Sequence, residues 1–273
     1  MPARNGDAMS ILETFSLTRK FGQLTAVDSL SLAIQPEEIF GLLGPNGAGK
    51  TTTIKMLTTL LPPTSGDAVI AGFDLLRRPG DVRRVIGYVP QMLSADGTLT
   101  GYENLAIMGK LYDIPRRELK SRVNEALEFM GLADSADKMV RDYSGGMIRR
   151  LEVAQSMLHR PQVLFLDEPT TGLDPVARQT VWRLIEQLRA DYGTTILLTT
   201  HLMEEADHLC SRVAIMHHSR VVSVGVPAEL KAALGTPGVT LDDVFIHFTG
   251  DQIETGGSYR ETSRNRRVAR RLG

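Results

Sequence analysis

The segment GPNGAGKTTT, residues 44–53, constrains the fold of this chain more than any other feature. It places glycines, a lysine and a run of hydroxyl side chains between an apolar stretch, EIFGLL, and a stretch with helical spacing at 51–61. Gly44 to Thr51 matches the pattern G-x-x-x-x-G-K-[ST], in which a glycine-rich loop joins a buried strand to a helix. Glycines let consecutive backbone N–H groups point at phosphate oxygens, and the helix N-terminus adds partial positive charge. The segment therefore predicts a phosphate-binding loop in an α/β fold.

The loop positions have distinct expected parts in holding a nucleoside triphosphate. Lys50 can reach the β- and γ-phosphates, and the Thr51 hydroxyl can coordinate Mg²⁺. We expect the remaining contacts to come from Gly44, Asn46, Gly47, Ala48, Gly49 and Thr52. A chance match is the alternative in a chain with 25 glycines, but the strand before the loop and the helix after it argue against one.

The segment VLFLDEP, residues 163–169, predicts the second half of this site. Its apolar residues indicate a buried strand, and Asp167 and Glu168 follow at the carboxyl end, where open α/β sheets bind ligands. Asp167 would hold Mg²⁺, and Glu168 would polarise the attacking water. Adjacent carboxylates repel each other unless a cation lies nearby, so the pair favours this interpretation over two ordinary acidic residues at a strand end.

Two further polar residues follow predicted strands. His201 ends TTILLTTH, and Gln91 ends VIGYVPQ. A histidine in such a position is usually a structural residue with a hydrogen bond, and a glutamine there carries no information by itself. The position of His201 beside the strands already named is what makes it a candidate.

The rest of the chain shows alternating strand and helix patterns. Ile11 to Ile34 alternates apolar and polar residues, which is typical of antiparallel strands, and Gly97 to Asp142 has helical spacing throughout. From Gln162 onward, strands alternate with helices, which predicts a mostly parallel sheet covered by helices. We therefore expect an α/β fold, a P-loop NTPase core with an N-terminal antiparallel β layer and a helical subdomain. The expected boundaries are a flexible leader at 1–9, a nucleotide-binding domain at 10–249 with its helical part at about 92–160, and an arginine-rich tail at 250–273.

Composition limits the function classes. A formal net charge of −1 gives no overall field of the kind that marks a nucleic-acid binder, and a single cysteine, Cys210, excludes an internal disulfide. Cys210 has no metal-ligand spacing around it, which favours an ordinary helix position over a reactive thiol. No apolar run approaches the roughly 18 residues that cross a bilayer, so we expect another subunit to supply any membrane spans. The tail is interpreted either as disordered and solvated or as a contact for anionic lipid or an acidic partner loop.

The longest informative stretch is DYSGGMIRRLEVAQSMLHRPQVLFLDEPTTGLD, residues 142–174. It resembles the signature segment, second acidic motif and D-loop of the ATP-binding subunits of ABC transporters. The likeness extends over about Ile11 to Phe248, with the motifs in the family's order. It implies that ATP and Mg²⁺ are the cofactors, that ATP hydrolysis drives transport, and that the helical insertion is the signature subdomain.

The resemblance also implies roles that the local patterns leave open. Phe21 would stack on the adenine ring, Gln91 would contact Mg²⁺ or the lytic water near the docked membrane partner, and His201 would hydrogen-bond the γ-phosphate. The SGG segment precedes a helical run at 147–159, so it offers a helix N-terminus to an anion. A second copy of the subunit would complete the site through Ser144, Gly145, Gly146 and Asp174. Phe21 stands where tyrosine is frequent, and Tyr143 and Met147 replace the more familiar Leu and Gln of the signature.

Three segments resemble the daunorubicin/doxorubicin-resistance type of exporter within this family: TTIKMLTTLLPPTSGDAVIAGFDL, YSGGMIRRLEVA and VTLDDVFIHFTG. This implies a peripheral subunit on the cytoplasmic face of the cell membrane, working with a separately encoded permease and with a second copy of itself or a paralogue. Export of a drug, antibiotic or lipid-like compound is favoured over import, and the cargo stays open because it contacts the permease. The alternatives are a soluble ABC-type ATPase acting on ribosomes or DNA, and a nucleotide kinase. A single cassette with a short insertion argues against the first, and the signature segment argues against the second.

Overall fold

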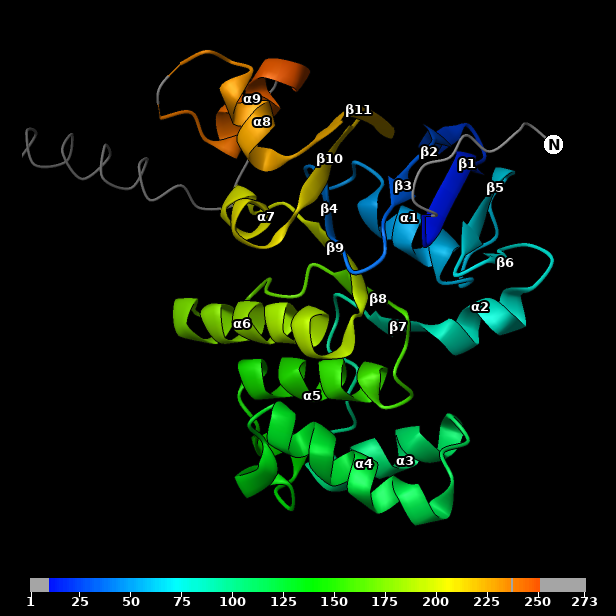
Figure 1. The fold of residues 1–273 in the computed structure, drawn as a ribbon, viewed down its shortest axis with the longest axis vertical. Helices are drawn as coiled ribbons and strands as arrows, with labels where there is room; N and C mark the ends of the chain where they lie inside the picture. Colours follow the sequence, from blue (N-terminus) through cyan, green and yellow to red (C-terminus); the bar gives the residue numbers. More distant parts are fainter. Residues whose placement is uncertain (1–9, 237, 251–273) are drawn as a thin grey trace, which may run out of the picture.

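Two β-sheets and the helices around them form the fold in the computed structural model, which describes residues 10–236 and 238–250 (Figure 1). The expected leader at 1–9 and the tail beyond Gly250 lie outside the described residues. The elements in chain order are β1 (Leu12–Phe21), β2 (Leu24–Leu30), β3 (Ala33–Ile34), β4 (Ile39–Leu43), α1 (Lys50–Leu57), β5 (Ser65–Ile70), β6 (Phe73–Asp74), α2 (Pro79–Val85), β7 (Ile86–Val89), α3 (Gly101–Leu111), α4 (Arg116–Phe129), α5 (Gly145–Met157), β8 (Val163–Asp167), α6 (Pro175–Tyr192), β9 (Thr195–Thr200), α7 (Met203–Leu209), β10 (Arg212–His217), β11 (Arg220–Gly225), α8 (Pro227–Ala232) and α9 (Leu241–Thr249).

The larger sheet has the strand order β11-β10-β4-β9-β8-β7. All neighbours from β10 to β7 pair in parallel, and β11 adds an antiparallel edge. The expected mostly parallel sheet is therefore confirmed. Because β4, β9 and β8 are neighbours, the segments that follow them meet at one edge of the sheet.

The central strands serve two hydrophobic cores, because side chains alternate between the faces of a sheet. In β4, Ile39 and Leu43 pack into the core with α5, α6 and α7. Phe40 and Leu42 pack into the other core, with α1 and the antiparallel sheet. A strand covered on both faces must be apolar at every position, which explains the continuous run in EIFGLL.

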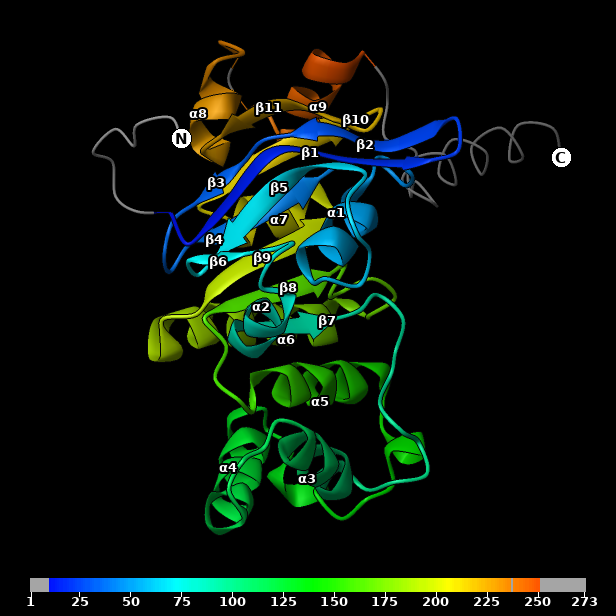
Figure 2. The same ribbon diagram turned by 90° about the vertical axis from the view of Figure 1, so that its right-hand side faces the viewer.

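The smaller sheet is antiparallel, with the order β2-β1-β5-β6 and β3 paired to β1. It is the expected N-terminal β layer, and Figure 2 shows it crossing the upper part of the molecule, below α8 and α9. Helix α1 contacts both β2 and β8, so it lies between the two sheets. The glycine-rich loop that leads into α1 is therefore enclosed from both sides.

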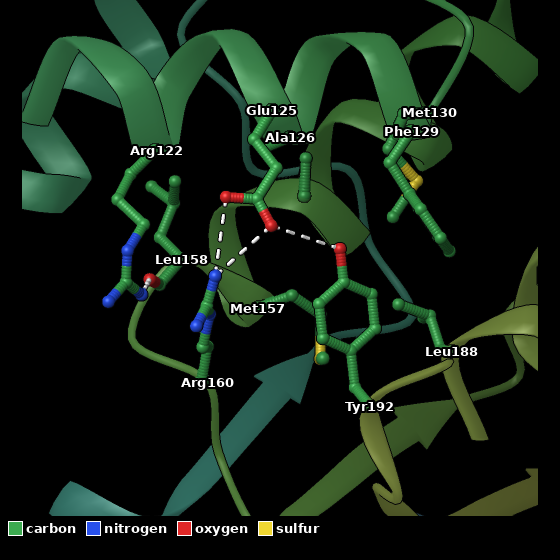
Figure 3. Close-up of a pocket in the computed structure, with 11 residues that line it drawn as sticks. Arg122, Glu125, Ala126, Phe129, Met130, Met157, Leu158, Arg160, Leu188 and Tyr192 are labelled. Atoms are coloured by element: carbon green, nitrogen blue, oxygen red, sulfur yellow. Dashed lines mark hydrogen bonds and ion pairs between the residues drawn. The ribbon is translucent and has the colours of Figure 1, made fainter. Parts of the chain in front are cut away.

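Helices α3, α4 and α5 make up the part furthest from the antiparallel sheet (Figure 1). A cavity of about 30 Å³ lies where α4, α5 and α6 meet, and Figure 3 shows the side chains that line it. Glu125 of α4 accepts hydrogen bonds there from Arg160 at 3.1 Å and Tyr192 at 3.4 Å. The cavity has room for about one water molecule, so it is no nucleotide site.

Two helix boundaries differ from the expectation. α1 ends at Leu57 instead of residue 61, because Thr59 adopts a left-handed φ of 62° that a helix cannot continue. α5 begins at Gly145 rather than at Met147, because Ser144 caps it by accepting a hydrogen bond from the Met147 N–H. The glycines of SGG thus belong to the first turn of the helix. None of the helices in the described part of the chain has the length and hydropathy needed to cross a membrane.

Candidate nucleotide site

A cleft of about 510 Å³ opens at the carboxyl end of β4, beside the glycine-rich loop. It brings together segments that are far apart in the sequence, including both sheets and the loop after β7. Its lining consists of Phe21, Leu24, Thr25, Ala26, Asn46, Gly47, Gly49, Lys50, Thr51, Thr52, Gln91, Glu168 and Ser219. Most of the sequence-predicted nucleotide residues therefore meet in one place.

The loop presents backbone amides to this cleft. Among the described residues, no side chain caps the N-terminus of α1, which begins at Lys50. Gly49 has a φ of 107°, and a Cβ there would lie 2.3 Å from the Ala26 carbonyl oxygen. Only glycine fits this close approach, and the uncapped N–H groups are left to bind an anion.

Lys50 is buried, with only 4% of its side chain exposed. Its ammonium donates to the carbonyl oxygens of Gly44 at 2.8 Å and Pro45 at 3.2 Å, and it lies 3.3 Å from Glu168 Oε1. Burial lowers the pKa of Lys50, while the charges of Glu168 and Asp167 oppose that shift. The loop thus holds one cation at the floor of the cleft.

Glu168 is the carboxylate at the centre of the site. Its Oε2 accepts hydrogen bonds from Gln91 Nε2 and Thr171 Oγ1, both at 3.1 Å, and lies 3.2 Å from His201 Nδ1. Burial alone would raise its pKa, but His201 and Lys50 outweigh burial and lower the pKa to about 2. Glu168 also has a left-handed φ of 49°, a strained conformation of the kind found at functional sites. It is ionised at neutral pH.

Asp167, the residue before Glu168, is buried, with 1% of its surface exposed. Its Oδ1 accepts hydrogen bonds from Thr51 Oγ1 at 3.1 Å and Thr199 Oγ1 at 2.7 Å, whereas the buried Oδ2 has no hydrogen-bond partner among the described residues. Thr199 also accepts a hydrogen bond from the Glu168 N–H at 3.0 Å. Sequence reasoning missed Thr199, although two threonines at the end of an apolar strand before His201 were a visible signal.

The signature segment and Asp174 share a second, separate surface. A Cβ on Gly146 would lie 2.9 Å from the Ala177 Cβ, so the first turns of α5 and α6 are in close contact. Ser144, Gly145 and Asp174 are exposed, and none of them lines the cleft. The structure therefore brings these predicted residues together with one another but not with the other predicted residues.

A buried ion pair on α5 holds the segment that carries Gln91. The Arg149 guanidinium donates to the carbonyl oxygens of Pro90 at 2.7 Å and Gln91 at 2.8 Å, and lies 3.1 Å from Glu152. Glu152 in turn accepts hydrogen bonds from the N–H and hydroxyl of Ser94. Sequence reasoning missed this pair, because arginines and glutamates on a helix usually face solvent.

The fold and the cleft together define a nucleotide-binding α/β protein of the P-loop class. Residues 27–171, more than half of the 273, match the family described as ABC transporter. The chain belongs to the ABC transporter family, as one of its ATP-binding subunits, and such subunits hydrolyse ATP and work with separate membrane permease subunits. The family and fold expected from the sequence are confirmed.

Sequence comparison identifies the members of this family that the chain resembles. The chain is 46% identical over 225 residues to the daunorubicin/doxorubicin resistance ATP-binding protein DrrA of Streptomyces peucetius. This alignment covers 82% of this chain and 68% of that protein. It is 43% identical to the Nod factor export ATP-binding protein I of Cupriavidus metallidurans, over 81% of this chain and 73% of that one.

Solved structures agree with the fold. A structure described as the ATP-binding subunit of an ABC transporter superposes with a TM-score of 0.78 at 28% identity, covering 88% of this chain and 99% of the other. CbiO1 from Clostridium perfringens, described as part of an ABC transporter complex, gives 0.75 at 28% identity, covering 82% and 91%.

Proposed function

We propose that two copies of this chain close over two molecules of Mg-ATP, and that this closure and the later opening drive a separate permease that exports a drug-like, antibiotic or lipid-like compound. The observation that carries the proposal is the division of the predicted residues between two surfaces. The cleft holds the cation, the carboxylates and the loop amides. The Ser144–Asp174 surface, defined as Ser144, Gly145, Gly146 and Asp174, offers the N-terminus of α5 and does not line the cleft of its own chain.

Glu168 is the residue that acts on water in this proposal. Its ionised carboxylate accepts a hydrogen bond from the attacking water, whose oxygen forms a bond to the γ-phosphorus as the bond to the β–γ bridging oxygen breaks. The released proton passes first to Glu168, and the leaving electrons go to ADP. Lys50 stabilises the negative charge on the phosphates, and His201 and Gln91 hold the carboxylate and the water in place.

The residues present fit Mg²⁺. A buried carboxylate oxygen of Asp167 without a hydrogen-bond partner, next to the Thr51 hydroxyl, is the kind of oxygen donor set that binds this ion together with phosphate and water. We assign Thr51, Asp167 and Gln91 as its protein contacts, direct or through water. The ion supplies charge neutralisation for the γ-phosphate.

The second copy supplies the donors that one copy lacks. The N-terminus of α5 is partly positive, and Ser144 and Gly145 there are exposed, so a γ-phosphate held by another copy can reach its N–H groups. At the start of α6, by contrast, Asp174 accepts hydrogen bonds from the Val176 and Ala177 N–H groups. A triphosphate between the two copies then acts as the adhesive, and cleavage removes it. In this proposal Phe21, which is exposed at the rim of the cleft, stacks on the adenine.

An apolar surface next to Gln91 supports a permease partner. Met92 and Leu93 follow Gln91 and are 81% and 50% exposed. Contiguous exposed apolar groups favour a protein interface. We propose that α3 to α5 form the signature subdomain, that the permease docks here, and that the chain therefore lies on the cytoplasmic face of the membrane. Relatives named for resistance and export favour export over import.

The experiment measures dimerisation of two variants by light scattering with Mg-ATP. Glu168→Gln keeps the shape of the site but removes the proton acceptor, so ATP should persist and hold a stable dimer. Adding Gly145→Asp should abolish that dimer, because it places a negative charge on the Ser144–Asp174 surface, while each monomer still binds ATP. Gly145→Ala is the matched control, since a Cβ there meets only Leu173 at an ordinary 3.6 Å.

A Glu168→Gln variant that binds Mg-ATP yet stays monomeric, even with its permease present, contradicts the two-copy mechanism. Co-purification of the chain with ribosomes and no membrane protein contradicts the transporter role.

A further inference from the structure

Glu205 on α7 is a buried carboxylate that the reaction described above does not use. Only 1% of its surface is exposed. Its Oε1 accepts hydrogen bonds from Thr170 Oγ1 at 2.6 Å and from Trp182 Nε1 at 2.9 Å. Its Oε2 is buried and has no hydrogen-bond partner among the described residues.

Such a group is costly to keep. A buried position favours an apolar residue, or a charged residue that is well paired. A hydrophobic side chain could fill the volume that Glu205 occupies. Glu205 has two neutral donors and no ion pair in the part of the chain that the structure describes. Packing alone therefore gives no reason for a carboxylate at this position.

The three segments that Glu205 joins are the ones that carry the reacting groups. Thr170 is two residues beyond Glu168, in the turn where the Thr171 N–H donates to the Glu168 carbonyl oxygen. α7 begins two residues after His201. Trp182 lies on α6, whose N-cap is Asp174.

We propose that Glu205 is a positioning residue that fixes Glu168, His201 and Asp174 relative to one another. One carboxylate oxygen binds a donor from the turn after Glu168 and a donor from α6, and its own helix follows His201. A shift of α6 or α7 therefore moves the turn that holds Glu168. The inference rests on the proposed hydrolysis and deepens it by naming what holds the catalytic carboxylate in place.

The network contains its own reporter. Trp182 is the single tryptophan of the chain, and it stacks on His208 of α7 at 4.9 Å between ring centres. Its emission therefore reports whether the contact between α6 and α7 is intact. A variant that loses activity by unfolding shows a red shift as the indole becomes exposed, whereas a variant that only shifts Glu168 does not.

The test compares the full chain with Glu205→Met and Thr170→Val. Glu205→Met keeps an unbranched side chain of similar length but removes the oxygen that accepts both hydrogen bonds, and Thr170→Val removes the hydroxyl at constant shape. Each should lower kcat about 10- to 100-fold, the cost of a displacement near 1 Å, while the Kd for Mg-ATP stays within about threefold and Trp182 emission keeps its maximum. The double variant should have a kcat no lower than that of the slower single variant, because both substitutions break the same contact between residues 170 and 205.

Two matched controls separate positioning from general damage. Glu204→Gln changes the exposed neighbour on the same helix and should leave kcat unchanged. Thr170→Ser keeps the hydroxyl and should retain most of the activity. The inference is overturned if Glu205→Met or Thr170→Val keeps kcat within threefold, or if their effects multiply in the double variant. Failure of the unmodified chain to bind Mg-ATP would instead overturn the proposed function, and this inference with it.

Discussion

The nucleotide cleft and the Ser144–Asp174 surface use the same chemistry in opposite settings. Both offer a helix N-terminus, that of α1 in the cleft and that of α5 on the surface. In the cleft, the loop is enclosed between two sheets, and Lys50, Asp167 and Glu168 are nearly inaccessible. On the surface, Ser144 and Asp174 are exposed and hydrogen-bond to the first turns of their own helices.

The difference shows which site is complete. The cleft contains cation, carboxylates and amides, so it can bind a triphosphate within one chain. The surface contains the N–H groups of α5 but no lysine, and its carboxylate, Asp174, accepts hydrogen bonds from its own helix, so in the proposed mechanism it completes a site on another molecule. Changes in the cleft should therefore affect binding by a single copy, and changes on the surface should affect only the assembled pair.

The largest effect is expected for Lys50→Ala. The substitution removes the phosphate-binding cation and leaves Glu168 buried without it, so kcat/KM should fall by at least about 10²-fold, and calorimetric titration should show weakened ATP binding. Ser144→Ala is the comparison on the other surface. It should lower turnover but leave ATP binding by the single copy within about twofold.

Equal effects of the two variants would contradict this distinction between the cleft and the Ser144–Asp174 surface. Unchanged hydrolysis in Lys50→Ala would refute the assignment of the loop. Loss of single-copy ATP binding in Ser144→Ala would show that the surface belongs to its own cleft.

The next effect is a pH dependence confined to the cleft. The pKa of Glu168 falls from an ordinary 4.5 to about 2 on folding, so its ionised form stabilises the folded state above pH 4.5, and this stabilisation is lost as the pH falls through about 2. Between pH 7 and pH 3 the native chain should lose on the order of 2 kcal/mol more unfolding free energy than Glu168→Gln. Urea titrations of both proteins at the two pH values measure the difference. Parallel losses in the two proteins would mean that Lys50 and His201 do not stabilise the carboxylate.

The residues that meet in the cleft could be picked out from the sequence because each motif is local. The loop GPNGAGKT and the pair Asp167–Glu168 at a strand end can each be recognised from a few consecutive residues. The strand order of the larger sheet then places the two motifs close together. The same holds for the strands themselves, since a continuous apolar run indicates burial on both faces. The ends of helices were harder: the left-handed Thr59 that ends α1 has no local sequence signal.

The supporting residues could not be predicted for a different reason. Thr199, Glu205 and Arg149 take their roles from hydrogen-bond partners that are 23 to 59 residues away in the chain. Arginines and glutamates on a helix are usually solvated, so no local pattern distinguishes the buried ones, and the threonines before His201 indicate a buried position without identifying its partner. Only the packing of α5, α6 and α7 against the sheet reveals them.

The smallest predicted effect concerns the link between the two regions compared above. The exposed Ser144 caps the start of α5, and less than two turns later Arg149 of the same helix holds the backbone of Gln91. The Gln91 side chain in turn donates a hydrogen bond to Glu168. Arg149→Lys keeps the charge but cannot span both carbonyl oxygens, so Gln91 should lose its fixed position and kcat should fall about tenfold with the Kd for Mg-ATP unchanged. Arg150→Lys is the matched control, because Arg150 lies on the same helix but donates to the Met130 carbonyl oxygen instead of to Gln91. Turnover assays of this variant should show less than a twofold change. Equal losses in the two variants would mean that α5 supports the fold in general rather than Gln91 in particular.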